Sequence, residues 1–198
     1  MSDDHEDDER LRAAWAAYRA ADPGEGERKA RAFLADHADN GLGWYALACC
    51  LERQGCHGQA DICFRHANRA KVAPQSAPYR ASWRRFNQLV ERARDALTPD
   101  LRTALDEIEL VLTDYAEPDL LADFEDAEIL GLFVGHERGE RVEAEDPTPP
   151  RIHLFRRAHE HSCREADEFA HEVKRTLWHE FGHYLGYGED GIAKLGLE

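Results

Sequence analysis

The amino-acid sequence predicts a helix-rich α+β fold, with helical hairpins first and then a short sheet beside a long helix. Apolar residues at helical spacing fill the first half of the chain. Three short apolar runs of strand length follow, at residues 108–112, 130–134 and 151–155. A long amphipathic helix is expected next, over residues 164–185. Because strand-length runs appear only in the second half, we expect the sheet there.

The first half is expected to form two helix pairs. In the first pair Trp15 and Tyr18 lie at helical spacing, and Asp22-Pro23-Gly24 marks a turn. A further helical pattern covers residues 77–97, and Thr98-Pro99 is typical of the start of another helix. The acidic, proline-rich segment 139–150 is expected to be a loop, and residues 192–195 a final helical turn.

The second helix pair has the spacing of a known repeat. WYALACCL at residues 44–51 is followed by ADICFRHA at residues 60–67. This pattern resembles the tetratricopeptide repeat (TPR), in which small residues allow two helices to approach closely. We therefore interpret residues 10–76 as a TPR-like helical region and a possible binding surface for a protein partner. Ordinary helix packing without a binding groove explains the same spacing.

The composition argues against two classes of partner. The 198-residue chain has a formal net charge of −15, whereas nucleic acids and anionic membranes bind basic patches. No apolar run approaches the roughly 18 residues of a membrane span. Residues 1–9 are expected to form an acidic tail and lack the features of a signal peptide. We therefore expect a cytoplasmic protein that binds neither nucleic acid nor membrane, and its acidity favours basic substrates.

The segment TLWHEFGHYLGYGED, residues 176–190, contains the candidate site. His179 and His183 are four residues apart, so on a helix they share one face, with about 5–6 Å between their Cβ atoms. Two imidazoles at this spacing can bind one zinc ion at about 2.0–2.1 Å. Glu180 then lies beside the metal, where its carboxylate can accept a proton from zinc-bound water. We therefore expect Zn²⁺ as the cofactor and Glu180 as the general base.

A third ligand is expected shortly after the second histidine, because catalytic zinc sites have three protein ligands and one open position. Gly186 allows the helix to end, since glycine accepts a positive φ. Glu189 is then placed to return as the third ligand. Asp190 is the alternative if the turn closes one residue later.

The helix that carries this motif is expected to be amphipathic. Its apolar stripe consists of Ala166, Ala170, Val173, Leu177, Phe181 and Tyr184. His179 and His183 fall on the opposite side, so burial in a core does not account for them. The alternative to a metal site is a solvated helix face without a function.

From about residue 83 onward the chain resembles the minimal zincin-like metallopeptidase family. The matching segments are a leading helix, the strand at 108–112, LGLF at 130–133, RIHLFRR at 151–157 and TLWHEFGHYLG at 176–186. The resemblance implies a compact α+β domain with a short sheet beside the zinc helix, which we place at residues 77–198. It also implies His179, His183 and Glu189 as zinc ligands and Glu180 as the base.

The expected function is hydrolysis of peptide bonds in a peptide or protein substrate through a zinc-activated water. An extended substrate is expected along the edge of strand 130–134 or of strand 151–155. Tyr187 and Tyr184 are the candidates for an oxyanion donor, and Tyr184 is expected rather to pack.

The alternative function is a helical-repeat adaptor with a structural or inactive zinc site. A structural site needs a fourth protein ligand, for which the candidates are Asp190, His153, His159 and His161. Otherwise residues 159–161 are expected to form an exposed turn.

Overall fold

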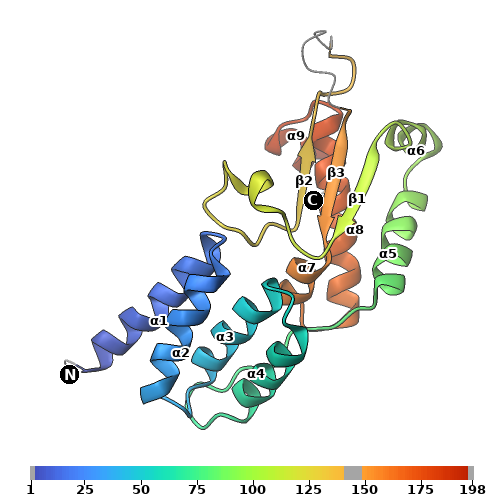
Figure 1. Cartoon of the computed structure of the whole chain (residues 1–198). Helices are drawn as coiled ribbons and strands as arrows, with labels where there is room; N and C mark the ends of the chain where they lie inside the picture. The colour runs from blue at the N-terminus through green and yellow to red at the C-terminus, as the bar shows by residue number, and fades with distance from the viewer. Residues whose placement is uncertain (1–2, 141–148, 196–198) are drawn as a thin grey trace. The chain divides into compact units, whose positions relative to one another are not determined.

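The computed structural model describes residues 3–140 and 149–195, which form two compact units (Figure 1). The first unit extends to residue 77 and includes residues 117–128, and the second contains residues 78–116 and those from 129 onward. Helices dominate both units, and a three-stranded sheet lies in the second. The predicted helix-rich α+β fold class is therefore confirmed.

The first unit is a series of helices that pack in sequence order. Each helix packs on the next one along the chain: α1 (Asp3–Arg19), α2 (Pro23–Asp36), α3 (Gly41–Arg53) and α4 (His57–Arg69). Asp22 and Asn40 cap α2 and α3 by accepting hydrogen bonds from the backbone N–H groups of Glu25 and Gly43. Helix α1 begins at Asp3, so it includes most of the segment that was predicted to be an acidic tail.

The small residues of the second helix pair lie in the core of this unit. Ala48, Ala60 and Ala67 are buried, and the ring of Trp44 stacks on His66 with 4.6 Å between centroids. Ordinary helix packing accounts for these contacts. The resemblance to the tetratricopeptide repeat therefore stays a prediction.

A segment from the second half of the sequence completes the helical unit. Residues 117–128 include the short 3₁₀ helix η1 (Pro118–Leu121). The Tyr18 hydroxyl donates to the Glu128 carboxylate at 2.6 Å, and the Ala127 N–H donates to the Arg19 carbonyl at 2.8 Å. These contacts join the end of α1 to residues more than one hundred positions later.

Within the described residues, the second unit contains the sheet and five helices. The sheet order is β1-β3-β2, formed by β1 (Glu109–Thr113), β2 (Gly131–Val134) and β3 (Arg151–Phe155). Strand β3 pairs in parallel with β1 and antiparallel with β2. All three predicted strands are confirmed to within one residue. Because β3 is central, it offers no free edge, and of the two candidate substrate edges only β2 remains.

Helix α8 (Ala166–Tyr184) is the long amphipathic helix of this unit, and it packs on β2, β3 and α5 (Trp83–Asp95) (Figure 1). Val173, Leu177 and Phe181 are fully buried, as predicted. The predicted stripe is wrong at its start: Phe169 is buried and Ala166, at the helix N-terminus, is exposed. Helix α6 (Pro99–Leu105) begins where Thr98-Pro99 predicts, and α9 (Glu189–Leu195) includes the helical turn predicted at 192–195 but begins three residues earlier.

The helix predicted over residues 77–97 begins only at Trp83. Pro78 disfavours the helical conformation at the residue before it. The N–H of Ala81 donates at 2.8 Å to the carboxylate of Glu160 instead of entering a helix, and Ser82 provides the N-cap. The prediction that this helix starts at residue 77 is therefore wrong, because a long-range contact keeps the residues before Trp83 out of the helix.

The exposed turn predicted at residues 159–161 is also wrong. These residues lie in helix α7 (Arg156–Ser162), and His159 and Glu160 have no exposed surface. The Glu160 carboxylate accepts hydrogen bonds from Arg80 at 2.9 Å, Arg156 at 3.1 Å and Arg157 at 2.8 Å. Buried carboxylates require such partners. Glu160 therefore joins α7 to the segment that leads into α5.

Most of the predicted loop at residues 139–150 cannot be compared with the structure, because residues 141–148 lie outside the described residues. Within the described part of the chain, no helix has both the length and the apolar composition needed to cross a bilayer.

Candidate metal centre

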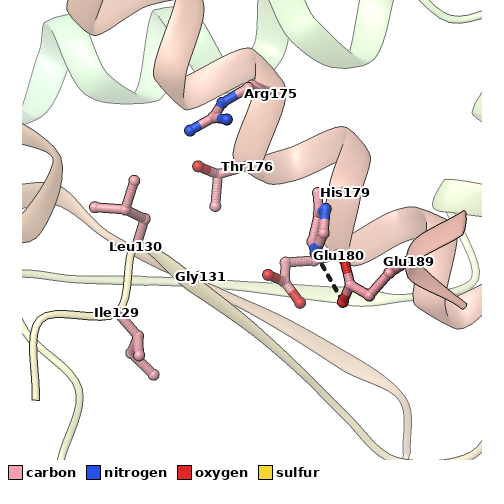
Figure 2. Close-up of a pocket in the computed structure, with 8 residues that line it drawn as sticks. All are labelled: Ile129, Leu130, Gly131, Arg175, Thr176, His179, Glu180 and Glu189. Atoms are coloured by element: carbon pink, nitrogen blue, oxygen red, sulfur yellow. Dashed lines mark ion pairs between the residues drawn. The ribbon is translucent and has the colours of Figure 1, made fainter. Parts of the chain in front are cut away.

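The three side chains predicted as metal ligands lie together at the C-terminal end of α8. The Nε2 atoms of His179 and His183 are 3.1 Å apart. An Oε1 atom of Glu189, the first residue of α9, lies 3.7 Å from His179 Nε2 and 3.4 Å from His183 Nε2. Figure 2 shows Glu189 directed toward His179. Among the described residues this is the one group of three or more potential ligands that the structure brings together.

These spacings fit a tetrahedral zinc ion. With Zn–ligand bonds of about 2.0–2.1 Å, two ligands at the tetrahedral angle are about 3.3–3.4 Å apart. The three observed separations, 3.1, 3.4 and 3.7 Å, bracket this value. Two imidazoles and one carboxylate are also a donor set that catalytic zinc sites use. Asp190, the alternative third ligand, is not in the group.

Two glycines place Glu189 next to the histidines. Gly186 follows the end of α8 with a φ of +83°, and this confirms the predicted turn. Gly182 lies inside α8, where a Cβ atom would come within 2.7 Å of the side chain of Ile192. The absence of that Cβ lets the buried Ile192 of α9 pack directly on α8. We did not predict a role for Gly182, although a glycine inside a helical pattern is a usual signal of close packing.

Glu180 lies between the histidines and the free edge of β2. The N–H of Phe155 donates to the carbonyl of Leu130. Because every second residue of an antiparallel strand directs its backbone groups at its neighbour, those of Leu132 and Val134 also face β3. The backbone of Gly131 and Phe133 therefore faces the free edge. There the Phe133 N–H donates to Glu180 Oε2 at 2.9 Å. Burial raises the pKa of Glu180 above its ordinary value, while His179 and the Phe133 N–H oppose this shift.

Gly131 allows β2 to approach α8 closely. A Cβ atom at this position would lie 2.5 Å from Thr176 Cγ2 and 3.1 Å from Glu180 Cγ. A glycine within a strand often marks such an approach, but the partner helix is not identifiable from the sequence.

Gly131→Ala is expected to lower the free energy of unfolding by about 1–3 kcal/mol, because the added methyl group overpacks the contact with Thr176. The measurement is chemical denaturation of both proteins. Gly188→Ala is the matched control, since a Cβ there meets nothing within 4 Å. Equal stability of the two variants would contradict the close approach.

A pocket of about 510 Å³ lies beside the metal centre (Figure 2). It is lined by Ile129, Leu130, Gly131, Arg175, Thr176, His179, Glu180 and Glu189. Its walls therefore come from the start of β2, two turns of α8 and the start of α9. A cleft of this size next to a carboxylate with a raised pKa has the usual features of an active site.

The buried His159 contacts Thr176, one of the residues that line this pocket. His159 Nδ1 lies 2.8 Å from the Phe155 carbonyl oxygen, which can only accept a hydrogen bond, so Nδ1 donates. Nε2 is then the acceptor for the Thr176 hydroxyl at 3.0 Å. Burial lowers the pKa of His159 to about 4. His159 is thus a neutral link between α7 and α8, and its position excludes it from the group of metal ligands.

His159 is expected to make the protein less stable in mild acid. In the unfolded chain this histidine binds a proton near pH 6.5, whereas in the folded protein it does so only near pH 4. The neutral His159 therefore contributes fully to the free energy of unfolding above pH 6.5. This contribution is lost as the pH falls toward 4, and the loss is at most about 3 kcal/mol. Denaturation of wild type and His159→Gln at several pH values measures this contribution. Identical pH slopes for the two proteins would contradict it.

Neither candidate oxyanion donor lines the pocket. The hydroxyl of the buried Tyr184 donates to Glu107 at 2.9 Å, as its predicted packing role suggests. The Tyr187 ring is half-exposed and lies close to Gly191.

Comparison with known families finds a similarity in the second half of the chain. Residues 105–197, just under half of the chain, match the family model of the zincin-like metallopeptidases. A comparison with curated proteins finds no match. The family match indicates zinc-dependent peptidase activity for the second half of the chain.

Proposed function

We propose that this protein is a zinc metallopeptidase in which His179, His183 and Glu189 hold the metal and Glu180 is the general base. The observation that carries this proposal is the spacing of the three ligand atoms, which is that of a tetrahedral zinc site. The family match over residues 105–197 supports the same reaction. We place the domain that performs it at residues 77–198, of which residues 117–128 group with the first unit.

The chain's own residues have three tasks in this reaction. Bound zinc would supply Lewis-acid polarisation of the substrate carbonyl and acidify a water molecule. Glu180, held by the Phe133 N–H, takes a proton and returns it to the leaving amine; its raised pKa makes the carboxylate a stronger base for the first of these transfers. The free edge of β2 at Gly131 pairs with an extended peptide, while the Phe133 N–H at the same edge holds Glu180.

The alternative is an adaptor with a structural zinc site, and the geometry favours it less. A structural site is closed by a fourth protein ligand. Asp190, His153, His159 and His161 were the candidates, and none is in the described group of ligands. The TPR-like helical region at residues 10–76 fits either function, as a surface that recruits a protein substrate or partner.

The test is digestion of an unfolded peptide library with zinc-loaded and metal-free protein, read by mass spectrometry. The proposal predicts new peptide termini only with the zinc-loaded protein, and these termini define the cleavage preference. An undigested library together with one zinc ion per chain would favour the adaptor.

A further inference from the structure

The pocket contains one charged side chain that the proposed reaction does not use. Arg175, Glu180 and Glu189 are the charged residues that line it, together with His179. Glu180 and Glu189 are assigned to the base and the metal. Thr176 is also engaged, because its hydroxyl donates to His159. Arg175 is therefore the group that remains to recognise a substrate.

Arg175 lies at a distance from the metal centre that a bound peptide can span. It precedes His179 by four residues on α8, so the two share a face about 6 Å apart along the helix axis. An extended peptide advances about 3.3 Å per residue. Figure 2 shows the Arg175 guanidinium beyond Thr176, at the end of the pocket opposite Glu189. A side chain about two residues from the scissile bond can therefore reach it.

The Arg175 side chain is oriented and still accessible. Its Nη2 donates to Glu172 at 2.6 Å, and 46% of its side chain is exposed. A guanidinium has five N–H donors, and the contact with Glu172 uses one of them. The others can bind a second carboxylate in a bidentate manner, which is a strong type of charge-assisted hydrogen bond.

We propose that Arg175 selects substrates that carry a carboxylate about two residues from the scissile bond. This inference rests on the proposed peptidase function. The carboxylate can belong to an acidic side chain or to the C-terminus of the substrate. The preference is opposite to the basic substrates that the net charge of −15 favours, because the net charge does not describe the field inside one pocket.

Peptide binding tests the role of Arg175 without turnover. The full chain carrying Glu180→Gln is loaded with zinc and titrated with fluorescent peptides that differ only in Glu or Gln at one position. A second series compares a free C-terminus with an amidated one, which separates the two sources of the carboxylate. About fivefold tighter binding is expected for the carboxylate member of at least one series.

Two further substitutions identify the residue responsible. Adding Arg175→Gln is expected to abolish the fivefold preference. Lys174→Gln is the matched control, because it removes the same charge from an exposed neighbour whose ammonium group lies over the Trp178 ring at 4.0 Å. The preference should persist in this control. Equal or undetectable binding of the paired peptides, or a preference that survives Arg175→Gln, would overturn the proposal.

Cleavage of the same peptides by zinc-loaded wild type separates this proposal from the proposed function. Cleavage at equal rates would leave the peptidase intact and refute the role of Arg175. Arg175-dependent binding without cleavage would support the carboxylate site and refute the peptidase. Equal binding without cleavage would refute both.

Discussion

Glu180→Gln is expected to lower kcat for peptide hydrolysis about a thousandfold, within the range that general bases contribute. The glutamine carbonyl can still accept the Phe133 N–H that holds Glu180 Oε2 at 2.9 Å. The side chain therefore keeps its position and loses only its ability to take a proton. Because Glu180 is outside the ligand group, the variant should still bind one zinc ion. Steady-state kinetics and metal analysis of the same preparations measure both effects.

Glu165→Gln is the control for this substitution. Glu165 is exposed at the N-terminal end of the same helix, so the change should leave kcat as in wild type. Turnover by Glu180→Gln at the wild-type rate would refute the assignment of the base. Loss of zinc together with turnover would show instead that Glu180 acts in metal binding.

Glu160→Ala is expected to lower the free energy of unfolding by about 3 kcal/mol, because the buried Arg156 keeps only Asp114 as a carboxylate partner and the buried Ala81 N–H loses its acceptor. Glu160 has no exposed surface and accepts hydrogen bonds from Arg80, Arg156 and Arg157. The guanidinium of Arg156 also lies 4.6 Å from the centre of the Trp83 ring. Urea denaturation followed by tryptophan fluorescence measures the loss, and Trp83 reports directly on this cluster.

Glu165→Ala removes the same charge from an exposed position and should change stability by no more than about 0.5 kcal/mol. Similar denaturation midpoints for Glu160→Ala and this control would mean that the arginine cluster does not depend on Glu160.

The parts of the fold that depend on local pattern were predictable from the sequence. Strands β1, β2 and β3 are short apolar runs, and α8 has a clear helical period. Helix α7 was missed because its polar residues suggest solvent exposure. Glu160 is buried with two arginines of its own helix and with two partners about eighty positions earlier in the sequence, Arg80 and the N–H of Ala81. The sequence order of residues does not reveal such partners.

The same distinction applies to the site. His179, His183 and Glu189 are close in sequence, so helical spacing and one glycine were enough to predict that they would meet. Gly131 and Phe133 approach Glu180 from a different strand, and their roles depend on β2 being an edge strand. Pattern alone left that edge undecided between β2 and β3. The role inferred for Arg175 depends on the pocket wall that β2 provides.

The most direct test of the account is a crystal structure of the zinc-loaded protein, in which the protein ligands of the metal are counted. The account predicts three, namely His179 and His183 through Nε2 and Glu189 through its carboxylate, with Glu180 adjacent but not bound to zinc. A fourth protein ligand, from Asp190 or any other residue, would close the site and contradict the assignment of a peptidase.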